Sequence, residues 1–355
     1  MTPVEISWFG ALCDDDYEQL GVVQPELRSS WEHCSSIVRA AEDSGYDSIL
    51  LPSGYDLGID TVSFASSIAP LTSRMKLLVA VRCGEVWVPQ LARQLATLHH
   101  TLNGRLDINI ISSEMPGESL DGPARYRRTT ETMQALRTLL RGERLDVDGE
   151  FLQLHLDAPR ICREMETVPP FYFGGLSNEA RDTAARDADV YLMWPDTEAE
   201  IAAIIDDMTS RAATYKRTLK FGYRVHVVVR DSEEEAYAAA AHLISAVDAS
   251  TGDAIRARSL DSTSVGVRRQ AELREASDGD GFIEDNLWTG IGKARSGCGA
   301  AIVGTPQQVA AKIRRYQELG IDAFILSGYP HRDEATRFAS TVMPLLAHAP
   351  LSFGA

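Results

Sequence analysis

The sequence predicts a (β/α)8 barrel with insertion loops, in which parallel strands alternate with helices that cover them. Short apolar runs alternate about eight times with longer segments whose apolar residues recur every three or four positions. Hydrophobic residues make up 44% and charged residues 24% of the 355 residues, and no second zone of composition interrupts the chain. Barrels with insertions reach this length. We therefore expect one domain over residues 1–355, with a doubly wound open sheet as the alternative.

The predicted strands are the short apolar runs, and the predicted helices are the segments of helical period between them. The strands lie at residues 4–9, 48–51, 76–82, 106–112, 170–173, 190–194, 219–230 and 323–327. The helices lie at residues 31–44, 61–71, 88–102, 125–140, 178–186, 198–216, 233–247, 307–319 and 333–346.

Two stretches break this alternation. Residues 141–169 contain LDVDGEFLQLHLDAPR, in which apolar and polar residues alternate as in a small hairpin. Residues 248–299 are long, polar and rich in Arg, Ser, Gly and Asp. A segment of this size in a compact domain is usually a functional lid or a disordered insertion. Because it follows the seventh strand, where barrel loops line the catalytic face, we expect a lid.

Charge and cysteine content narrow the classes of partner and compartment. Acidic residues outnumber basic ones by 51 to 35, for a formal charge of -16, so we expect no nucleic-acid or membrane partner. An anionic small-molecule substrate would therefore need a few local cations. The 5 cysteines are widely spaced without a CxxC motif, so we expect reduced thiols and no metal site. The first residues, MTPVEISWFG, lack the pattern of a signal peptide, and we expect a cytoplasmic protein.

Two common nucleotide-binding motifs are missing from the sequence. It contains no GxGxxG after a strand and no GxxxxGKS/T. If the protein performs redox chemistry, its reducing equivalents are expected to arrive on a cofactor that was reduced elsewhere.

The segment PPFYFGGLSNEARD (169–182) has the pattern of a strand, a glycine turn and a helix. Gly174 and Gly175 allow the backbone to approach a ligand closely, and Ser177 with the first N–H groups of the helix forms an anion site. A flavin phosphate fits this pattern. The alternative is an ordinary barrel turn in which Ser177 only caps the helix.

The segment FGYRVHVVVRD (221–231) places Arg224 and His226 on one face of a strand, because side chains alternate along it. An unpaired guanidinium inside a barrel would cost several kcal/mol, on the order of the penalty for a buried charge. Arg224 therefore requires an anion, either an internal carboxylate or a ligand. His226 beside it is suited to accept or donate a proton. The alternative is a structural Arg–carboxylate pair with a hydrogen-bonded histidine.

Three further segments carry candidate site residues. Arg295 lies among small residues in GKARSGCGAAIVG (292–304), where it either closes on an anion or is simply solvated. In DAFILSGYPHRDEA (322–335), Pro330 ends a strand, so Tyr329 and His331 are expected at its carboxyl end on the catalytic face. Alternatively, Tyr329 caps the core and His331 begins a helix. Trp194 in YLMWPD offers either a flat wall for a ring or a core side chain.

Together these segments resemble the luciferase-like flavin monooxygenases, and most closely their alkanesulfonate monooxygenase branch. The resemblance covers nearly the whole chain and implies the luciferase-like form of the barrel. Its most specific segments are LNGR (102–105), FGG followed by Ser177, VYLMW (190–194), KFGYRVHV (220–227), NLWTGIGKARSGCG (286–299) and LGIDAFILSGYPH (319–331).

The resemblance also implies site residues and a cofactor. It places substrate binding and oxygen activation at Trp194, Arg224, His226, Arg295, Tyr329 and His331. It places flavin contacts at Asn109, Arg125, Tyr126, Gly175 and Ser177. In the enzymes that this chain resembles, FMN is used as FMNH2 with O2, a separate NAD(P)H-dependent flavin reductase supplies it, and the subunits form homodimers or homotetramers.

In the alkanesulfonate branch the reaction converts a sulfonate to an aldehyde and sulfite, and Arg224 and Arg295 would hold the sulfonate oxygens. This chain departs from that branch at Leu57, where the relatives generally have cysteine, and in ALCDDDYEQLG (11–21), which replaces a loop with histidine and glycine. We therefore expect a different sulfonate, bulkier or sugar-like, such as sulfoquinovose. The alternatives are oxidation of carbon or nitrogen in a non-sulfonate metabolite, deazaflavin-dependent hydride transfer, and flavin binding without catalysis.

Overall fold

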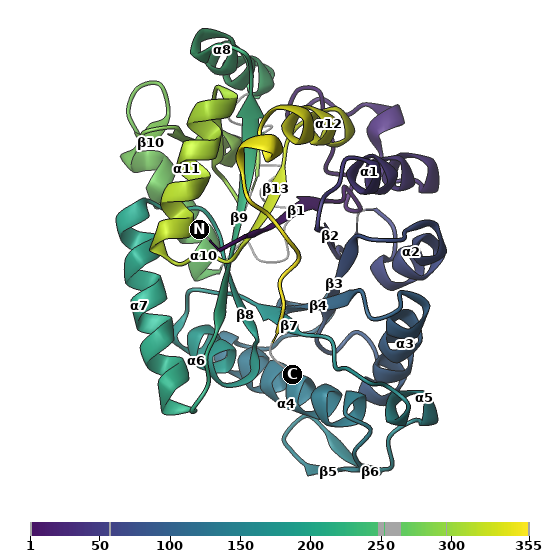
Figure 1. The fold of residues 1–355 in the computed structure, drawn as a ribbon. Coiled ribbons are helices and arrows are strands. Elements are labelled where there is room, and N and C mark those ends of the chain that lie inside the picture. Colours follow the sequence, from purple (N-terminus) through teal and green to yellow (C-terminus); the bar gives the residue numbers. More distant parts are fainter. Residues whose placement is uncertain (1, 57, 248–251, 253–263, 296, 354–355) are drawn as a thin grey trace.

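Eight parallel strands close into a ring in the computed structural model, which describes residues 2–56, 58–247, 252, 264–295 and 297–353 (Figure 1). Strand β13 pairs with both β1 and β9, and β9 also pairs with β8, so no open edge remains in the ring. The expected barrel is thus confirmed, and the open sheet is excluded. In ring order the strands are β1 (Glu5–Phe9), β2 (Ser48–Leu51), β3 (Lys76–Arg82), β4 (Leu106–Ile111), β7 (Phe171–Phe173), β8 (Val190–Met193), β9 (Lys220–Val229) and β13 (Ala323–Ser327).

Helices surround this ring and begin at the residues that the sequence marks as caps (Figure 1). Ser, Thr or Asp side chains accept a hydrogen bond from the third helical N–H at most of these starts, as at Ser177 and Thr305. Asp121 caps α4, so this helix begins three residues before the predicted start at residue 125. The helices of the ring are α1 (Trp31–Asp43), α2 (Thr61–Ile68), α3 (Val88–Thr101), α4 (Gly122–Leu140), α6 (Asn178–Asp187), α7 (Glu198–Thr214), α8 (Glu233–Leu243), α11 (Pro306–Leu319) and α12 (His331–Thr341).

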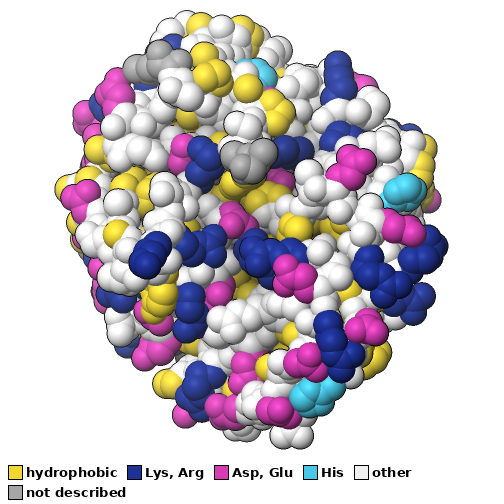
Figure 2. Space-filling view, turned by 60° about the horizontal axis from the view of Figure 1, so that its bottom comes forward, with side chains coloured by type: hydrophobic (Ala, Val, Ile, Leu, Met, Phe, Trp, Pro, Cys, Tyr) yellow, Lys and Arg dark blue, Asp and Glu magenta, His cyan; other side chains and the backbone are white. Residues whose placement is uncertain are grey.

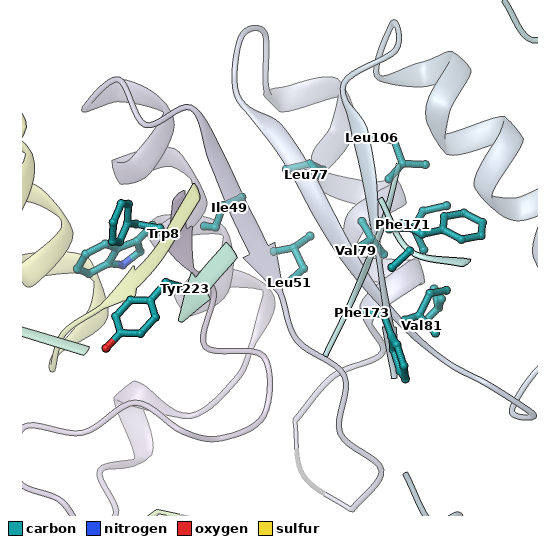
Figure 3. Close-up of a cluster of buried hydrophobic side chains, with 14 of the residues drawn as sticks. Trp8, Ile49, Leu51, Leu77, Val79, Val81, Leu106, Phe171, Phe173 and Tyr223 are labelled. Carbon is teal, nitrogen blue, oxygen red and sulfur yellow. The ribbon is translucent and has the colours of Figure 1, made fainter. Parts of the chain in front are cut away.

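Alternation along the strands separates two layers of buried side chains. One face packs on the helices, and Figure 3 shows part of this layer, with Trp8 and Tyr223 among the buried side chains. The other face fills the barrel interior, where Phe9, Leu50 and Tyr172 belong to one apolar cluster. Since inward and outward residues alternate, the register of β9 places Arg224 and His226 inside the barrel.

Charged side chains of the protein close the amino-terminal mouth of the barrel. Lys76 Nζ lies 3.4 Å from carboxylate oxygens of both Glu5 and Asp107, and it donates to the Leu351 carbonyl at 2.8 Å. The Leu351 N–H donates to Glu5 at 2.8 Å. Figure 1 shows the carboxyl-terminal segment running across this end of the ring. The buried charges at this mouth therefore have partners within the chain.

The first insertion folds as predicted. Strands β5 (Leu145–Asp148) and β6 (Gln153–Leu156) form an antiparallel hairpin, followed by the short helix α5 (Arg160–Arg163). Glu131 of α4 accepts hydrogen bonds from three backbone N–H groups of the hairpin turn at 2.9–3.0 Å. The hairpin is therefore attached to α4. In the chain it comes after this helix and not after a barrel strand. It lies away from the carboxyl ends of the strands.

The second insertion contains regular structure that the sequence did not predict. Its described part holds helix α10 (Val265–Ala276) and strands β10 (Phe282–Glu284) and β11 (Leu287–Trp288). Strand β12 (Ala301–Gly304) follows and pairs with the end of β9 beyond β8, where no strand was predicted. Residues 248–251, 253–263 and 296 of this insertion lie outside the described residues.

Charged side chains of both signs cover the molecular surface. Figure 2 shows Lys and Arg interspersed with Asp and Glu over one face. Exposed pairs such as Arg127 with Glu150, at 2.8 Å, account for part of this mixing. Within the described part of the chain, the helices are too short or too polar to cross a membrane.

We predict that Asp107→Asn flattens the pH dependence of stability. Burial, only partly opposed by the Lys76 cation, raises the pKa of Asp107 from 3.8 to about 7 in the folded protein. The folded state therefore holds an extra proton between about pH 4 and pH 7, so stability falls as pH rises through this window. Urea unfolding across this range should show a slope up to about 1.4 kcal/mol per pH unit shallower in the variant. The exposed Asp206→Asn is the control, and parallel curves for wild type and Asp107→Asn would contradict the prediction.

Candidate functional site

A cavity of about 460 Å³ opens at the carboxyl ends of the strands, opposite the Lys76 cluster. This volume lies within the range of pockets that bind small-molecule cofactors and substrates. Residues from the ends of the barrel strands line it, together with residues 264–266, 294–295 and 297–298 of the second insertion. Arginines reach the cavity from several of these elements, namely Arg82, Arg125, Arg224 and Arg295.

Arg224 is buried inside the barrel without a carboxylate partner. Its side chain is 3% exposed, and it donates to the Val225 carbonyl at 2.9 Å and to Ser327 Oγ at 2.8 Å. Its guanidinium carbon lies 4.3 Å from the centre of the Phe9 ring. Within the described residues no carboxylate lies at ion-pair distance from it, and burial together with Arg295 lowers its pKa. The internal ion pair that was the alternative for Arg224 is therefore not formed there.

Arg295 approaches the same ring from the second insertion. Its guanidinium carbon lies 6.0 Å from the centre of Phe9. It donates to Asp15 Oδ2 at 3.1 Å and to the Tyr329 hydroxyl. Burial alone would lower the pKa of Arg295, but Tyr329 and Asp15 raise it above its ordinary value. Two guanidinium groups thus lie near the Phe9 ring, and among the described residues only Asp15, which pairs with Arg295, places a carboxylate at ion-pair distance from either.

Ser327 connects Arg224 with His226. Its hydroxyl oxygen accepts from Arg224 and lies 2.7 Å from His226 Nδ1. A serine hydroxyl that accepts from arginine can still either donate to Nδ1 or accept from it, so this contact fits both tautomers of a neutral His226. Burial and the two arginines lower the pKa of His226 well below its ordinary value, which keeps the ring neutral. His226 does not line the cavity, and its Nε2 is buried without a partner in the described residues.

Tyr329 and His331 lie behind the cavity wall. The Tyr329 ring stacks on His226 with centroids 5.3 Å apart and lies edge-on to His331 at 5.0 Å. Burial raises the pKa of Tyr329, so its hydroxyl keeps its proton. His331 is the first residue of α12 and is fully buried, with Nδ1 2.9 Å from Asp16 Oδ1. These positions agree with the alternative in which His331 begins a helix, and neither ring is part of the cavity lining.

The residues assigned to flavin lie together at the other side of the cavity. Gly175 has a φ of 147°, and a Cβ there would come within 2.7 Å of Ala180 Cβ and 3.6 Å of the Tyr126 hydroxyl. Ser177 caps α6 by accepting from the Ala180 N–H. Arg125 bonds Glu114 at 3.0 Å, but its buried Nε has no partner in the described residues. Asn109 lines the same region from β4.

Trp194 forms the wall between the barrel and the second insertion. A Cβ on Gly266 would lie 3.0 Å from the indole ring, and one on Gly297 would lie 3.2 Å from it. Only glycine fits comfortably at these two positions, because the insertion packs directly on the ring. The insertion therefore lies over the cavity, whereas Leu57 of the β2 loop lies outside the described residues.

Comparison with known proteins agrees with this geometry. A model of the luciferase-like monooxygenase family matches residues 13–323. The chain belongs to the luciferase-like monooxygenase family. It is 60% identical to a sulfoquinovose monooxygenase of Novosphingobium aromaticivorans, over 98% of each chain. It is 49% identical to a sulfoquinovose monooxygenase of Agrobacterium fabrum, over 96% of this chain and 89% of that one. A crystal structure of riboflavin lyase with modified FMN shares the fold, with a TM-score of 0.78 at 16% identity over 99% of this chain and 94% of that one.

Two sets of ionic contacts attach the second insertion to the rest of this luciferase-like barrel. Arg269 of α10 donates to both carboxylate oxygens of Asp196 at 2.7 and 2.9 Å. At the other end, the buried Lys312 of α11 donates to Glu198 and to Glu284 of β10, each at 2.6 Å. Bidentate contacts with buried carboxylates hold geometry more firmly than surface pairs.

Several residues of the site in this family member were not predicted from the sequence. Phe9 and Ser327 link the two cations and the histidine, and Asp15 and Asp16 bind Arg295 and His331. The acidic run CDDDYEQLG and the serine of the SGYPH segment were visible signals. Their partners lie hundreds of residues away, so spacing along the chain could not reveal the contacts.

We predict that Arg269→Ala loosens α10 without affecting the barrel. The substitution leaves the buried Asp196 without its bidentate partner, so local opening of the insertion should cost less free energy. Hydrogen exchange should accelerate at least about tenfold for amides of residues 265–276, while β1–β4 keep their protection.

The neighbouring Arg268→Ala is the matched control, because Arg268 is exposed on the same helix. Equal exchange of α10 in both variants would show that the contact with Asp196 does not anchor the insertion.

Proposed function

We propose that this protein is an FMNH2- and O2-dependent monooxygenase that desulfonates an organosulfonate, with sulfoquinovose as the favoured substrate. The observation that carries the proposal is the buried Arg224, which lacks a carboxylate and faces the same ring as Arg295. A ligand anion is the partner that this pair lacks. The sulfoquinovose monooxygenases to which the chain is 60% and 49% identical support a sulfonate as that anion.

The chemistry of the anion supports the same choice. A sulfonate stays ionised throughout the physiological range and offers three oxygens to planar guanidinium donors. The Asp15 carboxylate balances one of the two cations, which leaves one positive charge for a monoanion. The Phe9 ring packs against the Arg224 guanidinium at 4.3 Å and lies 6.0 Å from that of Arg295, so one side of Arg224 faces an apolar ring. Contacts between ions strengthen in such a water-poor site.

The residues on the other side of the cavity fit a flavin mononucleotide. The capped start of α6 at Ser177 suits a phosphate, and the glycine turn at Gly175 allows close approach of the backbone. The unpartnered Nε of Arg125 supplies a further donor toward an anionic group. Tyr126 and Asn109 would complete the contacts. When bound and reduced, this flavin would supply the electrons that activate O2.

The remaining site residues would orient the substrate and control protons. Arg224 and Arg295 would hold the sulfonate, while Trp194 would form the wall of the pocket. His226, kept neutral by burial and the two arginines, would hold one ring proton beside Tyr329. Residues 248–299 would act as the lid of a single barrel domain and exclude water.

The proposal includes partners beyond the substrate. A separate NAD(P)H-dependent flavin reductase would supply FMNH2, as is typical of two-component members of this family. We further propose a cytoplasmic homodimer or homotetramer, which light scattering of the purified protein would test.

A panel of sulfonates tests the reaction. The purified protein is mixed with FMNH2 and O2, and sulfite is measured with sulfoquinovose, short alkanesulfonates and a phosphate ester as anion control. We expect sulfite from sulfoquinovose above all others. Absence of sulfite with every sulfonate would contradict the proposal, and anaerobic turnover with a reduced deazaflavin would favour hydride transfer instead.

We predict that Arg295→Ala weakens sulfonate binding while flavin affinity stays nearly unchanged. Loss of a charge-assisted contact should raise the dissociation constant for sulfoquinovose about 10- to 100-fold. Arg295→Lys should give an intermediate value, because lysine keeps the charge but not the planar fork. Calorimetry with each ligand separates the effects, and equal sulfonate affinity in the alanine variant would remove Arg295 from the binding site.

A further inference from the structure

We infer that Asp15 accepts a hydrogen bond from a substrate hydroxyl group, so that the site selects hydroxylated sulfonates over plain alkanesulfonates. This inference rests on the proposed function, since it concerns the part of the substrate that adjoins the sulfonate. It assigns specificity to a carboxylate of the acidic loop that follows β1.

Asp15 holds an acceptor that the chain leaves unused. Its side chain lines the cavity and is 14% exposed, and Oδ2 accepts from Arg295 at 3.1 Å. The second oxygen, Oδ1, is buried and accepts no hydrogen bond from the described residues. A buried carboxylate oxygen without a donor is costly, and such an atom at a binding cavity indicates a ligand donor. Rotation of the carboxylate lets either oxygen face that donor.

The neighbouring aspartates of the same loop have partners within the protein. Asp14 accepts from the Ser29 N–H at 2.8 Å, and its other oxygen lies 4.0 Å from Arg28. Asp16 accepts from the His331 N–H and lies 2.9 Å from the rings of both His331 and His33. Of these three carboxylates, only Asp15 combines a cavity position with an unpaired buried oxygen.

The charges around Asp15 specify what kind of donor it accepts. A cationic group would be repelled by Arg224 and Arg295, which lie on the same Phe9 ring. An anionic group would be repelled by Asp15 itself. A neutral hydroxyl satisfies the carboxylate without either penalty, and the contact of Asp15 with Arg295 places this hydroxyl beside the sulfonate position.

The same arrangement acts against substrates without hydroxyl groups. An alkanesulfonate that fills the cavity would cover Asp15 and leave its oxygen unpaired. Sites built to bond a hydroxyl discriminate strongly against analogues that lack it, because a buried polar group then loses its partner. A sugar sulfonate avoids this cost.

Asp15→Asn tests the inference with two compounds of related shape. Sulfoquinovose and cyclohexylmethanesulfonate both carry a six-membered ring with a CH2–SO3⁻ group, but only the sugar has hydroxyls. Asparagine keeps one acceptor for Arg295 and puts an N–H2 donor where the free carboxylate oxygen was. We expect the sugar-to-cyclohexyl ratio of kcat/KM, and of affinity by calorimetry, to fall about 10- to 100-fold.

Glu18→Gln is the control for lost charge. It removes a carboxylate from the same loop, at an exposed side chain that does not line the cavity. Its ratio should equal that of the wild type.

An unchanged ratio in Asp15→Asn, with both compounds weakened equally, would overturn the inference and leave Asp15 as a support for Arg295 only. Failure of the proposed function looks different, because the wild type would then release no sulfite from either compound. The affinity ratio still tests Asp15 in that case.

Discussion

The burial of the Arg224 guanidinium inside the barrel is the constraint on which the site depends. At the amino-terminal mouth, Lys76 has Glu5, Asp107 and the Leu351 carbonyl as partners, so that end needs no ligand. At the carboxyl-terminal mouth, the partners of Arg224 in the described part of the chain are neutral acceptors and the Phe9 ring. The charged groups at the amino-terminal end of the barrel interior thus have partners of opposite charge. The charged layer at the other end, around Arg224, is incomplete because it lacks such a partner among the described residues. The incomplete layer is where we propose that an anion binds.

The second cation lies on the insertion, so the proposed anion would contact both the barrel and the insertion. Arg295 lies on the same segment whose glycines pack against Trp194, and whose helix α10 is attached to Asp196 through Arg269. An anion that pairs with Arg224 and Arg295 therefore joins the barrel wall to its cover. The same contact would stabilise the closed site and exclude water from it.

The acidic loop after β1 supplies the carboxylates of the site. Asp16 bonds His331 and His33, which ties this loop to α1 and α12. Asp15 balances Arg295 and retains a free acceptor oxygen. In a chain with a formal charge of -16, the proposed anion site thus depends on a local excess of buried arginine, while Asp15 would contact the neutral part of the substrate.

The sequence by itself determined the strand and helix order, the hairpin of residues 145–156 and the shared inner face of Arg224 and His226. These features follow from the spacing of apolar residues, which repeats every two residues in a strand and every three or four in a helix. A short stretch of sequence is enough to show this spacing. It did not reveal β12, because its residues AIVG end the glycine-rich segment 292–304, which was interpreted as a loop that carries Arg295. Only the tertiary structure decided that His331 turns to Asp16, that Ser327 bridges Arg224 and His226, and that Asp15 meets Arg295. Each of these contacts joins residues that are distant in the chain, so it depends on how closure of the ring rotates and aligns neighbouring strands.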